Sequence, residues 1–208
     1  MNANTEQRKL AAIMFTDMVG YSALAQHDEK LALELLEEHR SLLRSIFRKF
    51  NGTEVKTIGD AFLVEFNSAL EAAQCAIEIQ RALAKRNHDV TADRRIELKI
   101  GIHIGDVVHR GGDVYGDGVN IASRIEQLAG AGGICVSMDV ERQIRNALEA
   151  HFRVPGPVQR SNRCRKEAAG TRSAKQFAEH GPRLFSLLGA PLRGCDYANP
   201  QDVGIGFE

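Results

Sequence analysis

Residues 54–66 read EVKTIGDAFLVEF, and the clearest prediction of secondary structure comes from them. Phe62, Val64 and Phe66 alternate with other residues, which is typical of a strand with one buried face. Gly59-Asp60 supplies a turn before this strand, so residues 53–66 are predicted to form a β-hairpin. Two strands in succession, placed between helices, are the centre of a β-α-β-β-α-β unit.

The segments around the hairpin complete this order. Residues 10–16 (LAAIMFT) are a short apolar run and are predicted to be a buried strand. A helix with an apolar stripe is predicted over 28–50, with Asp28 as its N-cap, and a second helix is predicted over 68–87. Residues 96–108 alternate between apolar and other residues and are predicted to be a further strand. The apolar stripe of the first helix consists of Leu31, Leu35, Leu42, Ile46 and Phe50, and Ser68 and Glu71 match a capping box at the start of the second helix. Further along the chain, a helix is predicted over about 118–129, a strand at 134–136, and a helix from Ser137 to about Leu148. The predicted class is α+β, a ferredoxin-like βαββαβ sandwich with an irregular C-terminal extension.

A change in composition near residue 150 gives the domain boundary. Residues 1–150 hold 18 Lys/Arg and 22 Asp/Glu, residues 151–208 hold 9 and 5, and all five prolines lie in the second part. The predicted domain therefore covers 8–148, and 149–208 is predicted to be a divergent or disordered tail.

Several classes of protein are disfavoured by the sequence. The four cysteines are widely spaced without a CxxC or zinc pattern, which favours a reducing compartment. No apolar stretch reaches the ~18–20 residues of a membrane span, and the N-terminus has no signal-peptide core, so a cytoplasmic location is predicted. The basic tail lacks interleaved aromatic residues, so no nucleic-acid partner is expected.

Two aspartates are the strongest candidates for chemistry. Asp17 lies in FTDMVGYS (15–22), where the first predicted strand ends, and Asp60 lies at the hairpin turn. In a βαββαβ sheet the first and third strands are antiparallel neighbours, so the two carboxylates are expected to converge. Two such oxygen ligands can hold Mg²⁺ or Mn²⁺ against a phosphate. Aspartate is also common in turns, so either residue alone is a weaker signal.

At these motifs the chain resembles the class III nucleotidyl cyclases, the adenylate and guanylate cyclase catalytic domain. The resemblance covers about residues 8–148 and rests on FTDMVGYS, EVKTIGDAFLVEF and GGDVYGDGVNIASRIEQLAGAGGICVS (111–137). It implies two metal ions, Mg²⁺ or Mn²⁺, per active site, held by Asp17 and Asp60. It also implies phosphate contacts from the backbone N–H groups of Met18, Val19, Gly20, Tyr21 and Ser22.

The resemblance also identifies base-reading and catalytic residues. Adenine offers an acceptor at N1 and a donor at N6, and Lys56 and Asp113 supply the matching donor and acceptor at the family's positions. Guanylate cyclases typically carry Glu in place of this lysine. Asn120 and Arg124 are four residues apart and so share one helix face. The family assigns ribose positioning to the asparagine and stabilisation of transition-state charge to the arginine.

The expected reaction is the conversion of ATP to 3′,5′-cyclic AMP and pyrophosphate. Lys56 lies only a few residues before Asp60, which makes it hard for one chain to contribute both to a single pocket spanning a nucleotide. The family pairs two domains head to tail, and this chain has no internal repeat. A homodimer with two shared active sites is therefore predicted.

The resemblance fades after about Leu148. The family's closing strand pair and triphosphate-binding lysine have no clear match, and Arg160 and Lys166 are the only suggestions for that lysine. The tail is compatible with a divergent ending, a disordered extension or a frameshifted product. The alternatives left open are a guanylate cyclase, and a nucleotide-binding or dimerisation module impaired by the altered C-terminus. A polymerase- or diguanylate-cyclase-like palm is disfavoured by the VNIASR helix and by the Lys/Asp pair.

Overall fold

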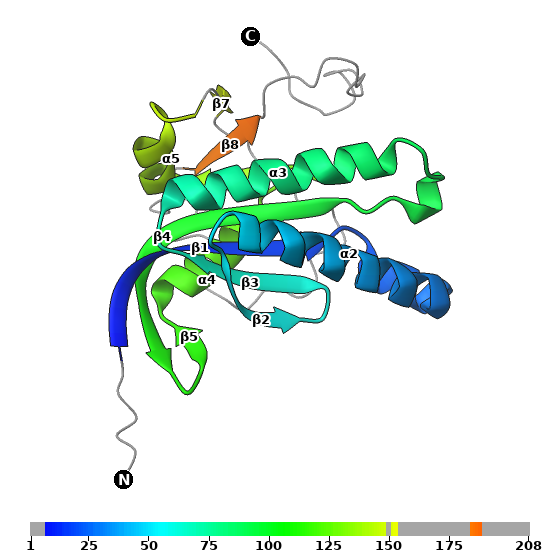
Figure 1. The fold of residues 1–208 in the computed structure, drawn as a ribbon, viewed down its shortest axis with the longest axis horizontal. Helices are drawn as coiled ribbons and strands as arrows, with labels where there is room; N and C mark the ends of the chain where they lie inside the picture. Colours follow the sequence, from blue (N-terminus) through cyan, green and yellow to red (C-terminus); the bar gives the residue numbers. More distant parts are fainter. Residues whose placement is uncertain (1–6, 149–150, 154–183, 189–208) are drawn as a thin grey trace, which may run out of the picture.

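The computed structural model describes residues 7–148, 151–153 and 184–188, and its centre is the predicted β-α-β-β-α-β unit (Figure 1). The elements are β1 (Gln7–Met18), α1 (Tyr21–His27), α2 (Glu29–Lys49), β2 (Thr53–Ile58), β3 (Ala61–Phe66), α3 (Ala69–Asn87), the 3₁₀ turn η1 (Ala92–Arg94), β4 (Leu98–Arg110), β5 (Asp113–Tyr115), α4 (Asp117–Glu126), β6 (Ile134–Ser137), α5 (Met138–Ile144), β7 (His151–Arg153) and β8 (Leu184–Leu188).

The strand order confirms the ferredoxin-like fold. The described strands form one sheet in the order β2-β3-β1-β4-β6-β8-β7, and β5 pairs with β4 outside this path. The first four positions, β2-β3-β1-β4, are the βαββαβ sheet, in which β1 runs antiparallel to both β3 and β4. The register places Thr16 opposite Phe62 on β3 and Asp17 opposite Lys99 on β4. The C-terminal end of β1 therefore lies beside the hairpin tip.

The two faces of the sheet are covered differently. In Figure 1, α2 and α3 lie side by side across one face, and α4 lies behind the sheet. Successive residues of β3 face opposite sides of the sheet. Phe62 and Val64 belong to the large core under α2 and α3, and Leu63 belongs to a smaller cluster with Ala122 of α4. Such alternation follows from the two-residue repeat of a strand. Most of the apolar stabilisation therefore comes from the face opposite α4.

The helix caps agree only in part with the sequence predictions. Asp28 caps α2 by accepting a hydrogen bond from Leu31 N at 3.0 Å, as predicted. Ser68 caps α3 through Leu70 N at 3.2 Å, but Glu71 accepts from the Asn51 side chain instead of returning to the cap. The buried face of α2 is also rotated from the predicted stripe. Its buried residues are Ala32, Leu35, Leu36, His39, Leu43, Ile46 and Phe47, while Leu31, Leu42 and Phe50 are only partly buried.

Short elements account for most other differences. β5 has three residues and α1 has seven, and neither gives a periodic signal in the sequence. α5 ends at Ile144, earlier than the predicted Leu148. After residue 148, where no strand was predicted, β7 and β8 pair antiparallel and β8 pairs with β6. These strands are three and five residues long, too short for alternation to be read.

Two further features concern the described residues only. No helix among them is both long and apolar enough to span a bilayer. Cys75 and Cys135 are buried free thiols. Burial raises the pKa of Cys75 to about 12 and that of Cys135 to about 11, so both stay protonated near neutral pH. Neither thiol is therefore a candidate nucleophile.

Candidate active site

Asp17 and Asp60 lie side by side at one end of the sheet. Asp17 is the last residue but one of β1, and Asp60 follows Gly59 in the tip between β2 and β3. The Asp60 Oδ2 atom accepts a hydrogen bond from the backbone N–H of Met18 at 3.1 Å. Both side chains keep partial access to solvent. The antiparallel pairing of β1 with β3 thus brings together Asp17 and Asp60, which are 43 positions apart in the sequence.

The electrostatics of this pair suit a divalent cation. Partial burial raises the pKa of Asp17, the negative charge of Asp60 raises it further, and Lys99 opposes the rise. Two carboxylates that repel each other in a half-buried site are stabilised when a cation binds between them. Among the described residues, no group of three or more histidine, cysteine, aspartate or glutamate side chains is arranged to hold a metal ion. Any metal here would be held by the two aspartates, with its remaining positions open to substrate and water.

Two charged residues beside this pair were missed by sequence reasoning. Lys99 lies directly across from Asp17 on β4. Glu126, at the end of α4, is buried, and desolvation followed by the charge of Asp17 raises its pKa to about 7. The signal for Lys99 is the β1–β4 register, which the sequence pattern alone does not give.

The backbone after β1 is partly committed to the fold. The predicted phosphate-binding amides run from Met18 to Ser22, but Met18 N–H bonds Asp60 and Val19 N–H bonds the Glu97 carbonyl at 2.9 Å. Tyr21 and Ser22 begin α1, where the first N–H groups have no carbonyl partner within the helix. Gly20 precedes them with a φ of 77°. The amides of residues 20–22 are therefore the ones left to face a phosphate.

The predicted base-reading pair forms a direct ion pair. The Lys56 ammonium on β2 donates to Asp113 Oδ2 on β5 at 2.7 Å. The hydrogen bond from Lys56, together with one from Val114 N–H, holds the pKa of Asp113 below its usual value. Both side chains are partly exposed, so a donor and an acceptor are presented side by side to a ligand.

Asn120 and Arg124 lie on the outer face of α4. Both are exposed, whereas Ala122 and Ile125 face the sheet. The helix sits unusually close to β4, because a Cβ on Gly101 would lie 2.2 Å from Glu126 N. The same helix thus leaves Asn120 and Arg124 exposed and buries Glu126 against the sheet. Arg160 and Lys166, the suggested triphosphate ligands, lie outside the described residues.

Comparison with known proteins identifies the family. Residues 3–167 match the model of the adenylate and guanylate cyclase catalytic domain, so the chain belongs to this family. Its fold is shared with solved cyclase domains. A structure from Silicibacter pomeroyi, described as an adenylate/guanylate cyclase/hydrolase, is 34% identical with a TM-score of 0.73, covering 89% of this chain and all (100%) of that one. The adenylyl cyclase CyaB from P. aeruginosa has the same fold at 20% identity, with a TM-score of 0.68 over 90% of this chain and 98% of that one.

Several curated relatives carry adenylate cyclase names. A putative adenylate cyclase 3 from Rhizobium meliloti is 37% identical over 179 residues, which cover 86% of this chain and 30% of that protein. An adenylate cyclase from Streptomyces coelicolor is 32% identical over 140 residues, 67% of this chain and 35% of that protein. The chain thus spans about a third of these relatives.

Proposed function

We propose that this domain is an adenylate cyclase that converts ATP to 3′,5′-cyclic AMP and pyrophosphate in a homodimer. Membership of the cyclase family supplies the reaction class. The observation that carries the choice of ATP is the Lys56–Asp113 pair, with its donor and acceptor 2.7 Å apart. Adenine presents an acceptor at N1 beside a donor at N6, which is the complement of such a pair.

The reaction is an intramolecular displacement. The ribose 3′-oxygen forms a bond to the α-phosphorus and loses its proton, while the bond to the bridging oxygen breaks and pyrophosphate leaves with the electron pair. Divalent cations, when bound, would supply Lewis-acid activation of the hydroxyl and neutralise charge on the triphosphate. Asp17 and Asp60 would hold them. Lys99, opposite Asp17 on β4, adds a positive charge that attracts the triphosphate.

The exposed face of α4 supports a shared site. Asn120 and Arg124 are exposed on a helix whose other face is packed on the sheet. In the proposed dimer, one chain contributes the two aspartates and its partner contributes Lys56, Asp113, Asn120 and Arg124. Each subunit then takes part in two active sites, as twofold symmetry requires.

Product analysis tests the substrate assignment. The 208-residue protein is incubated with Mn²⁺ and either ATP or GTP, and the products are separated by chromatography. Cyclic AMP as the main product supports the proposal. Preferential formation of cyclic GMP would make the protein a guanylate cyclase, and binding of nucleotide without any cyclic product would make it a nucleotide-binding module.

A further inference from the structure

The strand that carries Lys56 is weakly held by the core. β2 is the edge strand of the described sheet, and none of its side chains is buried. Its pairing with β3 is also irregular, because the register shifts between Glu54 and Lys56. Such a bulge leaves one residue without its regular pairing. On β2, Val55 packs against the small cluster around Leu63, and the Lys56 ammonium is paired with Asp113. Because the ladder beside Lys56 is irregular, polar contacts from other elements add to its positioning.

Arg44 of α2 supplies such a contact. Its Nε and Nη2 atoms donate to the two carboxylate oxygens of Glu54 at 2.8 and 2.9 Å. Glu54 in turn accepts a hydrogen bond from the Thr57 hydroxyl at 2.9 Å. This pair of parallel bonds fixes direction as well as distance. Through Glu54, Arg44 therefore contacts β2 at residue 54 directly and at Thr57 indirectly, on both sides of Lys56.

Arg40, one turn earlier on α2, holds the hairpin tip. Its Nη2 atom donates to the carbonyl of Gly59 at 3.0 Å, immediately before Asp60. Its Nη1 atom is oriented by Glu37 at 2.9 Å. Asp60 itself is bonded to Met18 N–H. The tip is thus held between α2 on one side and the end of β1 on the other.

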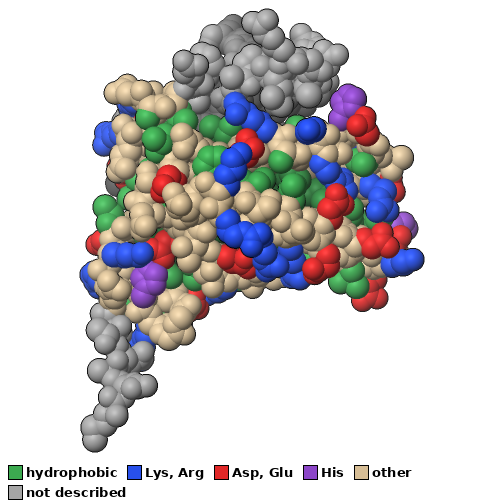
Figure 2. All heavy atoms as spheres, viewed as in Figure 1, with side chains coloured by type: hydrophobic (Ala, Val, Ile, Leu, Met, Phe, Trp, Pro, Cys, Tyr) green, Lys and Arg blue, Asp and Glu red, His purple; other side chains and the backbone are tan. Residues whose placement is uncertain are grey.

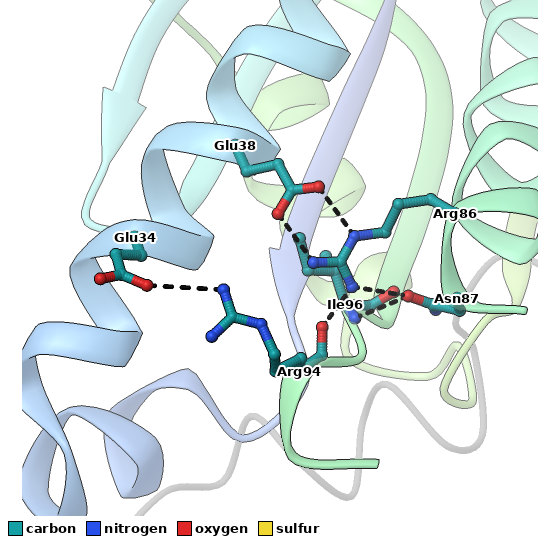
Figure 3. A network of polar contacts seen from close by, with 6 residues as sticks. All are labelled: Glu34, Glu38, Arg86, Asn87, Arg94 and Ile96. Atoms are coloured by element: carbon teal, nitrogen blue, oxygen red, sulfur yellow. Dashed lines mark hydrogen bonds and ion pairs between the residues drawn. The ribbon is translucent and has the colours of Figure 1, made fainter. Parts of the chain in front are cut away.

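The helix that carries these arginines is itself anchored on a different side (Figure 3). Glu38 of α2 accepts two hydrogen bonds from Arg86 of α3, at 2.9 and 2.7 Å. Glu34 accepts one from Arg94 at 3.4 Å, close to the segment that leads into β4. Together with the buried core face of α2, these contacts hold the helix in place independently of the hairpin.

We infer that Arg40 and Arg44 are positioning residues for the cyclase site, Arg40 for Asp60 and Arg44 for Lys56. The inference rests on the proposed function. Asp60 is assigned to the metal and Lys56 to the base, so the two arginines are expected to have separable effects. If the two arginines formed only surface ion pairs, their loss would change stability slightly and would leave metal affinity and base preference unchanged.

The test compares three arginines spaced one turn apart on α2, using Arg40→Gln, Arg44→Gln and Arg48→Gln in the whole 208-residue protein. Arg48 is the matched control, because it is exposed and has no side-chain partner among the described residues. Mn²⁺ affinity is measured by electron paramagnetic resonance. Relative affinity for ATP and GTP is measured by displacement of a fluorescent ATP analogue, and cyclic nucleotide formation is followed in parallel.

We expect Arg40→Gln to weaken Mn²⁺ binding about tenfold with the ATP/GTP preference unchanged. Arg44→Gln should lower the ATP/GTP preference about tenfold with Mn²⁺ affinity unchanged. Arg44→Lys should resemble Arg44→Gln, because an ammonium keeps the charge but not the paired bonds. Arg48→Gln should match the wild type in both measurements.

Equal effects of Arg40→Gln and Arg44→Gln on both properties, or none beyond those of Arg48→Gln, would overturn the inference. Circular dichroism shows whether each variant is folded. Glu54→Ala gives a second route, since it removes both acceptors of the Arg44 hydrogen bonds from the strand side. The binding measurements do not require turnover. An inactive wild type would therefore refute the proposed function while the arginine comparison still gives its answer.

Discussion

At the scale of single residues, the structure concentrates unusual electrostatics around a few side chains. Asp17 has a raised pKa because it is partly buried beside Asp60, and Glu126 has a pKa near 7 for similar reasons. The positive charge of Lys99 opposes the rise in the pKa of both carboxyl groups. Perturbed carboxylates in a half-open site are a common mark of functional chemistry.

The metal assignment predicts the effect of Asp17→Ala. Removing one of two cation-binding carboxylates should lower Mn²⁺-dependent cyclisation by more than about 100-fold, the scale of losing a group that stabilises transition-state charge. The far-ultraviolet circular dichroism should stay that of the wild type, because Asp17 is a partly exposed residue outside the hydrophobic clusters. Asp89→Ala, in an exposed loop, is the control. Cyclisation by Asp17→Ala at the control's rate would refute the assignment.

His39 is a second residue with a clear electrostatic consequence, and it lies in the core rather than in the site. It is fully buried against Phe62, and neither ring nitrogen has a hydrogen-bond partner among the described residues. Burial, together with Arg40 and Arg44, lowers the pKa of His39 to about 4. The unfolded state therefore binds a proton between pH 6.5 and 4, while the folded state does not.

Stability should fall as the pH decreases through this window. At pH 5, proton binding to His39 in the unfolded state alone lowers the free energy of unfolding by about 2 kcal/mol relative to pH 7.5. His39→Leu keeps a similar volume and removes this contribution, so its free energy of unfolding should depend less on pH between 7.5 and 5. Urea denaturation of both proteins at the two pH values measures the difference. An identical pH dependence would show that His39 does not titrate as described.

At the scale of elements, the strongest periodic signals were sufficient for the fold. The alternation of Phe62, Val64 and Phe66 and the Gly59-Asp60 turn predicted the hairpin, and the strand order confirms the unit built around it. The approach of Asp17 to Asp60 follows from that order. The metal-binding and base-reading roles remain predictions, because contacts within one chain do not identify a ligand.

Other elements carried too little signal. β5, β7 and β8 have three to five residues, and a two-residue repeat cannot be recognised over so short a length. Helical spacing placed Asn120 and Arg124 on one face, but it does not say which residue at the end of α4 meets the sheet. Glu126 and the grip of α2 on the hairpin depend on such three-dimensional contacts, so they had no counterpart in the sequence pattern.

The close packing of α4 on β4 gives a prediction at this scale. Gly101→Ala would place a methyl group 2.2 Å from Glu126 N and 2.8 Å from the Ala122 carbonyl, so the helix must shift. Overpacking against backbone costs about 1–3 kcal/mol, and the shift also displaces Arg124. Gly130→Ala is the matched control because nothing lies within 4 Å of its added carbon. Chemical denaturation should show a loss for the first variant only; equal stability of the two would contradict the packing.

At the scale of the whole molecule, charge is balanced locally. Figure 2 shows Lys/Arg and Asp/Glu side chains mixed over the face formed by α2 and α3, where pairs such as Lys49–Glu78 and Arg86–Glu38 occur. Their contribution to stability is small, because exposed pairs are worth about 0–1 kcal/mol each. The polar residues assigned to the reaction lie elsewhere, at the end of β1, at the hairpin and on α4.

The proposed activity therefore requires two molecules to meet through those surfaces. Asp17 with Asp60, and Arg124 with Asn120, belong to different halves of each proposed active site. A dimer with one intact half from each of two defective chains should regain function. No single-chain site has this property.

The most direct test is to mix two inactive variants, Asp17→Ala and Arg124→Ala, and to assay cyclic AMP formation with Mn²⁺. In an equal mixture that exchanges freely, half of the dimers are mixed and each has one intact site, so about a quarter of the wild-type rate is predicted. Differently tagged subunits, co-purified, measure how many mixed dimers form. Mixed dimers that form in that proportion and remain inactive would contradict the shared site.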